Sequence, residues 1–402
     1  MYSKNPCPYC GPAPTIHILD YYSVIIDRFT QKLFRPIDSL RQRLARILPS
    51  VNAGRFVLAL WKLLSFLHIG RIVTEPDDQV GHRGLWLWKE AQKRGIALIE
   101  YRLGRSRDFF VASYGEKVIA FQGLPRPTGK EYASLEWMDN KAEMRKRFAA
   151  AGIPVARGGD VRTWHQAVAL FRTLHKPVIT KPSIGSRGRH ATTRIMTEAD
   201  LKIGFDKAKL LSPWVIVEEE FLATLHRVTV IGGRVIGVLR RDRACIIGDG
   251  TRTIRDLVAV ENRNPHRDGP LFQHIETGEE ASEELRLQNL SWDSIPPKGQ
   301  WIGLSKKPSR SVGGSTMDIL DETHPANIAL FEKIARVLDD PLIGIDFFIE
   351  DMSQPWQEQT YAGVIECNSC PFIDLHHEPL YGPVRNAGGA LWSIIFPDQG
   401  AK

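Results

Sequence analysis

The sequence has few of the features that mark membrane-spanning or disulfide-bonded proteins. It has no apolar run of the roughly 18 residues that a membrane-spanning helix needs, and residues 1–7 lack the apolar core of a secretory signal. Its 5 cysteines form an odd number, which argues against a disulfide framework and favours a reducing compartment. We therefore expect a cytoplasmic protein. The 402 residues, 43% hydrophobic and 25% charged, are typical of a globular chain of two or three domains.

Most of the chain also lacks net charge, because the basic excess is concentrated at its beginning. Of the net charge of +7, an excess of six lies in residues 1–75, where ten Lys and Arg accompany four Asp and Glu. This segment has no stripe of aromatic and basic residues of the kind that reads nucleic acid, so we expect no nucleic-acid partner. We interpret residues 1–75 as a basic, largely helical extension that binds a surface.

Two apolar segments lie within this extension. Residues 37–48 repeat Leu and Ile at helical spacing among three arginines, and residues 55–69 are apolar nearly all round. Such a helix can lie in a membrane interface, or it can be buried against a domain or a second copy of the chain. Both interpretations stay open, namely a peripheral membrane contact through residues 37–71 and a homo-oligomer.

From residue 76 onward, helix and strand signals follow one another, which predicts an α/β (α+β) fold. Residues 76–135 contain a helix over 84–95, a strand over 96–103 and a hairpin over 108–122, so they form a small α/β unit. In residues 136–402 we expect a larger domain. Its predicted helices are 139–150, 163–174 and 253–262, its strands are 176–182, 214–221, 226–231 and 234–241, and 270–310 is predicted as a long polar loop with a short helix.

The most informative stretch is residues 342–371, which reads as two apolar strands joined by a polar turn. Asp346 lies on the first strand, and Glu366 and Asn368 lie two apart on the second, so these two share one face. In the expected register Asp346 joins them there. Two carboxylates and an amide oxygen suit Mg²⁺, which completes its octahedron with water and nucleotide phosphates. The alternative is a pair of carboxylates that simply face water.

Two loops and two cysteine pairs are weaker signals. The loop 183–190 contains glycine and arginine and can wrap phosphates, although its spacing is not that of a P-loop and by itself favours a flexible basic hairpin turn. The loop 311–316 is a second glycine-rich loop, which we expect to be mobile. Cys7 and Cys10 read as a redox dithiol, as half of a zinc site with Cys367 and Cys370, or as one of two unconnected pairs.

Taken in order, these residues resemble the ATP-grasp superfamily. The likeness is to the ATP-grasp region of cyanophycin synthetases and, more loosely, to glutathione synthetases and D-alanine–D-alanine ligases, and it covers about residues 84–400. The motifs that carry it are Asp139-Asn-Lys141, Lys181-Pro182 with Gly185 and Gly188, Val217-Glu-Glu-Glu-Phe, His226-Arg227, Gly248-Asp-Gly250, Gly313-Gly314, Gly344-Ile-Asp346 and Glu366-Cys-Asn368. The resemblance implies a nucleotide-binding lid at about 136–215 and a core with the metal site at about 216–402.

The resemblance also implies an ATP-dependent carboxylate–amine ligase that forms an amide through an acylphosphate, on an amino acid or small peptide. ATP and one or two Mg²⁺ ions, with Mn²⁺ as a substitute, are the implied cofactors, and a small carboxylate and an amine are the implied partners. The implied roles are as follows: Lys141, Lys181, Gly185, Ser186, Arg187 and Gly188 hold phosphates; Glu218, Glu219 and Glu220 contact ribose, the last two being preferred; Asp346, Glu366 and Asn368 hold metal; Arg227, with Arg240 or Arg241, and Gly313 and Gly314 serve catalysis.

Two alternative functions remain to be considered, and the residues that form the acceptor pocket are not settled by the sequence. The protein is alternatively a kinase that stops at phosphoryl transfer, or a membrane-recruited ATP-binding protein without turnover. His376, His377 and Arg385 follow the metal strand, and we place them either in the pocket for the carboxylate or amine or in a solvated turn. Because the chain has no P-loop and ends at residue 402, we expect one ligation per ATP.

Overall fold

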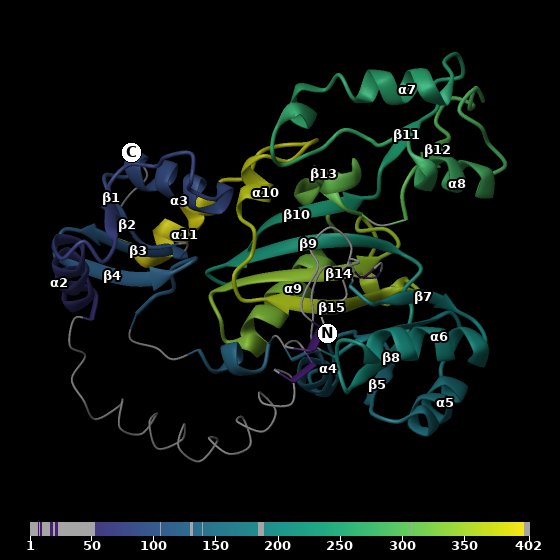
Figure 1. The fold of residues 1–402 in the computed structure, drawn as a ribbon, viewed down its shortest axis with the longest axis horizontal. Helices are drawn as coiled ribbons and strands as arrows, with labels where there is room; N and C mark the ends of the chain where they lie inside the picture. Colours follow the sequence, from purple (N-terminus) through teal and green to yellow (C-terminus); the bar gives the residue numbers. More distant parts are fainter. Residues whose placement is uncertain are drawn as a thin grey trace.

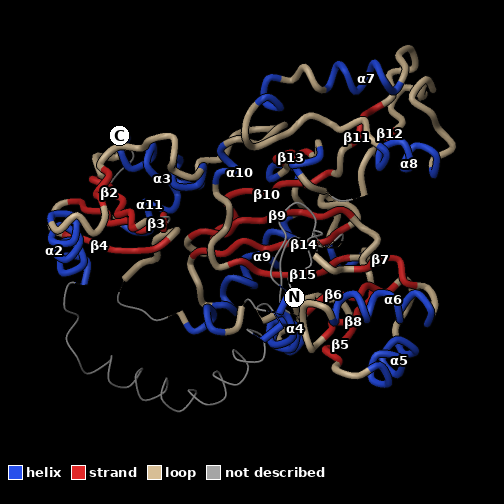
Figure 2. The backbone as a smooth tube through the Cα atoms, in the orientation of Figure 1, coloured by secondary structure: helices blue, strands red, loops and turns tan. Residues whose placement is uncertain are grey.

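The computed structural model describes residues 7, 9, 17–18, 21–22, 53–104, 106–128, 132–138, 140–183, 189–306 and 308–397. Figure 1 shows a small unit on the left, a central sheet, a lid at the lower right and an insert at the upper right. Strands form the centre of each of these parts, and most helices lie on their outer faces (Figure 2). The predicted α/β (α+β) class is confirmed.

The small unit is a four-stranded antiparallel sheet in the order β1-β2-β3-β4. Its strands are β1 (Arg71–Val73), β2 (Ala97–Leu103), β3 (Ser106–Tyr114) and β4 (Lys117–Gln122), and its helices are α2 (Ala53–Phe66) and α3 (His82–Lys93). A late helix, α11 (Ala387–Ile395), completes the unit, because Trp392 packs in one buried cluster with Trp88 and Phe110. The predicted helix, strand and hairpin of this region are confirmed. Residues 53–73 of the basic extension supply α2 and β1.

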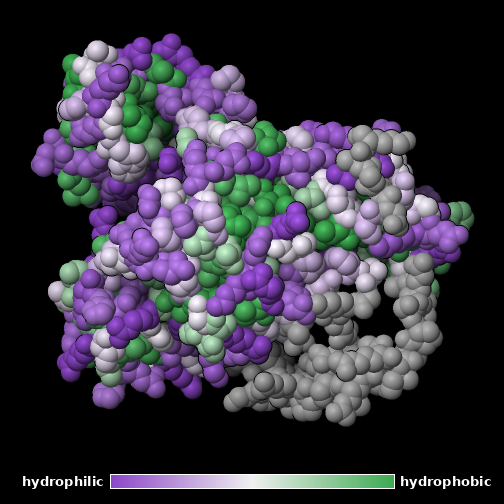
Figure 3. All heavy atoms as spheres, turned by 180° about the vertical axis from the view of Figure 1, so that it is seen from behind, coloured by the Kyte–Doolittle hydropathy of each residue, from purple (hydrophilic) through white to green (hydrophobic). Residues whose placement is uncertain are grey.

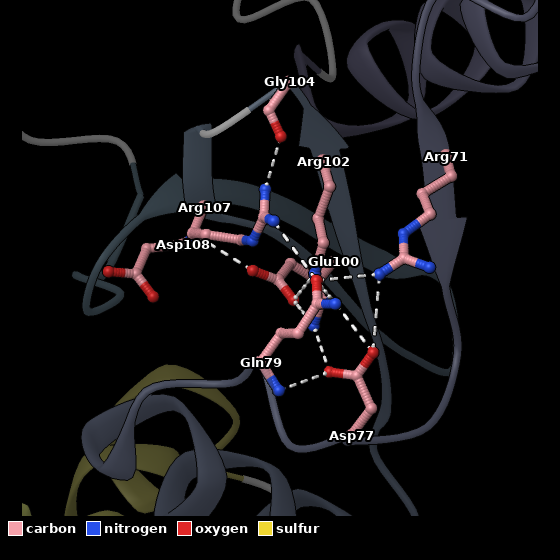
Figure 4. A network of polar contacts seen from close by, with 8 residues as sticks. All are labelled: Arg71, Asp77, Gln79, Glu100, Arg102, Gly104, Arg107 and Asp108. Atoms are coloured by element: carbon pink, nitrogen blue, oxygen red, sulfur yellow. Dashed lines mark hydrogen bonds and ion pairs between the residues drawn. The ribbon is translucent and has the colours of Figure 1, made fainter.

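One edge of this sheet carries a buried polar network (Figure 4). Arg102 is 2% exposed and donates from Nε to Glu100 at 2.7 Å and from both terminal nitrogens to Asp77 at 2.8 Å. The hydrogen bond from Arg102 holds the pKa of Asp77 at about 2. Gln79 and Arg71 extend the network to the surface. A buried guanidinium is tolerated here because two carboxylates compensate its charge.

The lid is a second antiparallel sheet, with the strand order β5-β8-β6-β7. Its strands are β5 (Gly158–Val161), β6 (Val178–Pro182), β7 (Thr192–Ile195) and β8 (Val215–Glu219), its helices are α5 (Trp164–Thr173) and α6 (Glu198–Lys209), and α4 (Lys141–Ala150) precedes them. Local sequence explains the helix starts. The Asn140 side chain caps α4, and Thr163 forms a capping box with Gln166 at the start of α5.

The central sheet has five antiparallel strands in the order β13-β10-β9-β14-β15. They are β9 (Thr224–Ile231), β10 (Arg234–Asp242), β13 (Ser315–Asp318), β14 (Leu342–Ile349) and β15 (Ala362–Asn368). One face is apolar and packs on α9 (Pro325–Leu338), with Phe347 and Phe331 fully buried at the contact. Because side chains alternate along a strand, the remaining positions form an opposite, polar face.

The insert between β10 and β13 contains the predicted helix over 253–262 and, within the loop predicted over 270–310, the expected short helix. It contains β11 (Cys245–Ile247), α7 (Ile254–Glu261), α8 (Glu279–Leu287), β12 (Trp301–Gly303), and the short 3-10 helices Pro265–Asp268 and Arg310–Val312. Widely spaced apolar residues, among them Ile275, Leu285 and Ile302, form a core of their own with α7. The strands β11 and β12 were not predicted, because three residues are too few to show an alternating pattern.

None of the helices among the described residues is long and apolar enough to cross a membrane. The exposed apolar side chains of α2, Phe56, Leu60, Leu63 and Phe66, follow one another at helical spacing on its outer side. Seen from behind, the surface is largely hydrophilic, with apolar patches near its middle (Figure 3). The same view shows the left edge hollowed between the insert above and the lid below.

Candidate functional site

A pocket lies where the lid meets the central sheet, and it contains both predicted lysines. Its lining comes from α4, β6, β8, β15 and the segment that leads into the lid, and consists of Lys141, Met144, Arg145, Val155, Ala156, Lys181, Glu218, Val364 and Ile365. The spacing of three and four residues places Lys141, Met144 and Arg145 on one face of α4. A bridge between Val155 and Val364 ties this segment to β15. One side of the pocket is thus apolar and the other is charged.

Carboxylates partner the cations of this pocket. Lys181 Nζ lies 2.5 Å from Glu218 Oε1, Arg145 donates to Glu218 Oε2 at 2.9 Å, and Lys141 Nζ lies 3.7 Å from Glu366 Oε2. Burial lowers the pKa of Lys141, and Lys181 adds to this effect while Glu366 opposes it. Three cations therefore converge around two carboxylates in a partly desolvated site, which favours an anionic ligand.

Of the three consecutive glutamates, only Glu218 lines the pocket. The carboxylate of Glu219 accepts from the backbone N–H of His175 at 2.9 Å, and that of Glu220 accepts from the backbone N–H of Arg194. The structure thus places Glu218 in this pocket, whereas the side chains of the preferred Glu219 and Glu220 bond to the backbone of the lid. Neighbouring side chains on a strand point to opposite faces, and the sequence alone does not say which face meets the pocket.

The polar face of the central sheet brings the three predicted metal ligands together. Asp346 lies directly opposite Glu366 in the β14–β15 ladder, and Gly344 lies opposite Asn368, so the three side chains share one face, as the sequence predicted. On the other side of β14, Asp346 lies opposite Arg227 of β9. Arg227 donates to both carboxylate oxygens, at 2.6 and 3.0 Å. Burial disfavours the charge of Arg227, but Asp346 outweighs this and raises its pKa.

The register of β10 decides between the two candidate arginines that follow Arg227. Leu239 lies opposite Arg227, so Arg241, two residues later, shares the polar face, whereas Arg240 lies on the opposite face. Burial lowers the pKa of Arg241, and the nearby Asp346 opposes this. Arg240 is instead paired with Asp242 at 2.9 Å. The geometry favours Arg241 as the partner of Arg227 and removes Arg240 from the site.

The glycine-rich loop 311–316 is packed, contrary to the expectation of a mobile loop. Ser315 and Thr316 belong to β13 and pair with β10. Gly313 has φ of +88°, and an added Cβ would lie 2.5 Å from the Cα of Ile275, while one on Gly314 would lie 2.6 Å from the backbone oxygen of Ser309. These glycines therefore permit close backbone packing between the insert and the central sheet.

The residues after the metal strand are buried, so the interpretation as a solvated turn was wrong. His376 is 0% exposed, and its Nε2 lies 2.7 Å from the Thr229 hydroxyl. His377 stacks on Trp86 and accepts from the backbone N–H of Gly388. Arg385 pairs with Asp318 and Asp321. His377 and Arg385 therefore hold elements together, and His376 alone lies against the polar face.

Two cations near the site were not predicted from the sequence. Arg145 is one helical turn after Lys141, and that spacing is the signal that could have found it. Arg310 comes from the insert, and no local pattern indicates that it lies near Arg227. Gly185, Ser186, Arg187 and Gly188 lie outside the described residues.

The described residues fit a polyphosphate held with a hard cation. Among them, the buried Nη1 atoms of Arg227 and Arg310 and the buried Nδ2 atom of Asn368 have no hydrogen-bond partner. Six cations (Lys141, Arg145, Lys181, Arg227, Arg241 and Arg310) accompany four carboxylates (Glu218, Asp346, Glu366 and Asp374), which leaves an excess of two positive charges. Carboxylates at Asp346 and Glu366 retain lone pairs that suit Mg²⁺, and the unpaired guanidinium donors suit phosphate oxygens.

Known biosynthetic proteins are similar to this chain in sequence. A scan against protein-family models finds no match. Cyanophycin synthetase of Trichormus variabilis is 29% identical over 328 residues, covering 80% of this chain and 36% of the relative. The glutathione biosynthesis bifunctional protein GshAB of Clostridium perfringens is 27% identical over 387 residues, covering 92% of this chain and 48% of the relative.

One solved structure is similar in fold as well as in sequence. The bifunctional glutathione synthetase from Pasteurella multocida matches with a TM-score of 0.60 and 26% identity, over 79% of this chain and 43% of that chain. The chain thus spans between about a third and a half of the length of the curated relatives it matches.

Proposed function

The chain belongs to the ATP-grasp superfamily, and from this premise we propose that it is an ATP-dependent carboxylate–amine ligase. The observation that carries the proposal is the convergence of two lysines from different elements, Lys141 on α4 and Lys181 on β6, in one pocket that borders Glu366. The names of the relatives, cyanophycin synthetase and glutathione biosynthesis protein, support an amino acid or small peptide as the substrate class.

The proposed reaction has two steps. A carboxylate oxygen of the first substrate attacks the γ-phosphorus of ATP, the bond to the β-phosphate oxygen breaks, and ADP leaves. The amine of the second substrate then attacks the acyl carbon of the resulting acylphosphate, and inorganic phosphate leaves with the electrons of the broken C–O bond and takes up the amine proton. The chain's main contribution is positioning and charge neutralisation.

Each group in the site has a proposed role. Lys141 and Lys181 hold the α- and β-phosphates, and Glu218 keeps Lys181 and Arg145 directed into the pocket. Arg227 and Arg241 stabilise the charge that develops on the transferred phosphoryl group and on the tetrahedral intermediate. Asp346, Glu366 and Asn368 would hold one or two Mg²⁺ ions, or Mn²⁺ in their place. When bound, such ions neutralise charge on the β- and γ-phosphates.

The test is ADP release with Mg²⁺ and ATP across a panel of amino acids and dipeptides, alone and in pairs. The double variant Asp346→Asn/Glu366→Gln is the blank. We expect one pair to stimulate ADP release and mass spectrometry to find the condensed product. ADP release with one carboxylate and no amide would instead support a kinase. ATP binding without turnover above the blank would refute the ligase and support a binding protein.

We further propose that the protein is cytoplasmic and contacts a membrane surface through the outer side of α2. None of the described cysteines, Cys7, Cys245, Cys367 and Cys370, is joined to another by a disulfide, which supports a reducing compartment. Phe56 and Phe66 of α2 are 67% and 79% exposed, and Arg55 and Arg71 flank them. Flotation with anionic vesicles tests this. A variant with Glu at positions 60 and 63 should stay unbound, and equal flotation of both proteins would refute the contact.

A further inference from the structure

A cluster of nitrogen and sulfur ligands lies outside the site described above. Cys7, His17 and His190 each offer one ligand atom, and these atoms all lie within 4.8 Å of one another. His190 is the last residue of the loop 183–190 in the lid, whereas the other two come from the beginning of the chain. We propose that these three residues bind a zinc ion that fastens the beginning of the chain to the lid. This inference is independent of the proposed reaction.

One of the ligand–ligand distances already matches zinc geometry. Zn–S bonds of about 2.3 Å and Zn–N bonds of about 2.0–2.1 Å, at a tetrahedral angle, place the two ligand atoms roughly 3.6 Å apart. Cys7 Sγ lies 3.5 Å from His190 Nε2. The ring of His17 meets that of His190 edge to face, with centroids 4.9 Å apart. Because the three ligand atoms lie within 4.8 Å of one another, an inward movement of His17 would complete a set of three ligands.

The surroundings of His190 point to the same role. Its Nδ1 lies 2.7 Å from the backbone oxygen of Lys207. Since a carbonyl can only accept, Nδ1 carries the proton, and the lone pair of Nε2 faces Cys7. Metal-binding histidines usually donate their other ring N–H to a carbonyl or carboxylate in this way. His190 is also 0% exposed, which fixes its orientation.

Neighbouring contacts hold Cys7 beside the lid. The backbone N–H of His190 donates to the backbone oxygen of Tyr9 at 3.3 Å, and Lys207 Nζ lies 4.8 Å from the centre of the Tyr9 ring. In the sequence, Cys7 begins Cys7-Pro-Tyr-Cys10, a two-residue spacing that is common in zinc proteins. Cys10 itself lies outside the described residues.

The structure does not support the four-cysteine site that the sequence left open. Cys367 packs in the apolar core of the central sheet. Cys370 packs instead against the core of the small unit. Because these two side chains belong to different cores, they do not face a common ion with Cys7. The proposed zinc ligands are therefore one thiolate and two imidazoles, and not four cysteines.

The test measures metal in the full chain, expressed with zinc and purified in excess Mg²⁺ without chelators. We expect about one zinc per chain in the natural sequence and less than about 0.2 in Cys7→Ser and in His17→Asn. Matched controls Cys245→Ser and His175→Asn, which remove the same residue types elsewhere, should keep their zinc. Circular dichroism checks that each variant is folded.

A cobalt experiment keeps the proposal testable if Cys7→Ser fails to fold. The Co²⁺ form of the natural chain should show a thiolate-to-cobalt charge-transfer band. Cys7→His should still bind Co²⁺ but lose that band. The proposal is overturned if the natural chain holds less than about 0.1 zinc, if Cys7→Ser and His17→Asn keep as much zinc as the natural chain, or if the cobalt form lacks the band.

Discussion

The pair formed by Arg227 and Asp346 gives the sharpest prediction, because it is buried and bidentate in the middle of the central sheet. The two side chains are 7% and 10% exposed and are joined by hydrogen bonds of 2.6 and 3.0 Å. Asp346→Asn leaves the guanidinium charge buried without its partner. Removing one member of such a pair costs about 3 kcal/mol, which lowers the ratio of folded to unfolded protein roughly 150-fold. Arg227→Met should cost a similar amount.

Removing both charges at once should cost much less than the sum of the two single changes. In the double variant Arg227→Met/Asp346→Leu no buried charge remains unpaired, so we expect a coupling free energy of about 2 kcal/mol or more. Urea unfolding curves, recorded by tryptophan fluorescence, give the free energy of unfolding of the natural chain, the two single variants and the double variant. ADP release should be lost in each variant, because both residues lie in the proposed site.

Arg240→Met is the matched control for the stability measurement. Arg240 lies on the opposite face of the neighbouring strand, its side chain is 40% exposed, and it pairs with Asp242. An exposed pair contributes about 1 kcal/mol or less, so this variant should unfold close to the natural chain. Simple additivity of the two single changes, or an Asp346→Asn protein as stable as the natural one, would refute the reasoning about buried charge.

Three further predictions follow from the contacts described above. Lys181→Ala should raise the Kd for ATP about 10- to 100-fold in titration calorimetry, because a charge-assisted contact of roughly 1.5–3 kcal/mol is lost. Gly313→Ala should lower the free energy of unfolding by about 2 kcal/mol or more in urea titrations, since its Cβ would lie 2.5 Å from Ile275 Cα. Burial lowers the pKa of His376 to about 3 and of His377 to about 4. The unfolded chain therefore binds protons first, and each histidine should remove about 2 kcal/mol of stability as the pH falls from 7 to 5.

Each of these has a matched control. Arg147→Ala changes a cation of α4 that is 45% exposed and lies outside the pocket, and an equal loss of ATP affinity there would contradict the role of Lys181. Gly299 has φ of +84° with nothing near its Cβ, so Gly299→Ala isolates the backbone strain from the clash. Equal losses of unfolding free energy in Gly299→Ala and Gly313→Ala would contradict the argument that close packing at Gly313 causes the loss. His377→Gln should make the free energy of unfolding less dependent on pH between 7 and 5. An unchanged pH dependence would mean that His377 does not cause it.

The sequence predicted the elements whose pattern is local. The hairpin of β14 and β15 could be found because apolar residues alternate around Asp346 and Glu366, and their register placed Asn368 on the same face. The starts of α4 and α5 could be found because Asn140 and Thr163 are capping residues. Such signals depend only on neighbours within a few residues.

The remaining features depend on contacts between distant segments. The choice of Glu218 over Glu219 depends on which face of β8 meets the pocket, and the choice of Arg241 over Arg240 depends on the register of β10. Arg310 reaches Arg227 only because the insert folds back on the sheet. Local periodicity carries no information on such approaches, so Arg310 was missed, the two arginines were left as alternatives, and the preferred glutamates were not the one that lines the pocket.

The helix α11 has a consequence for how the protein is made. The first unit in the chain, β1 to β4 with α2 and α3, shares its core with Trp392 and Ile395 of α11. A ribosome adds about 5–20 residues per second, so the sheet that ends at Gln122 waits roughly 15–50 seconds for this helix to be synthesised. During that time its apolar surface is open to chaperones. Shortening the chain before Ala387 should therefore expose the unit that was synthesised first.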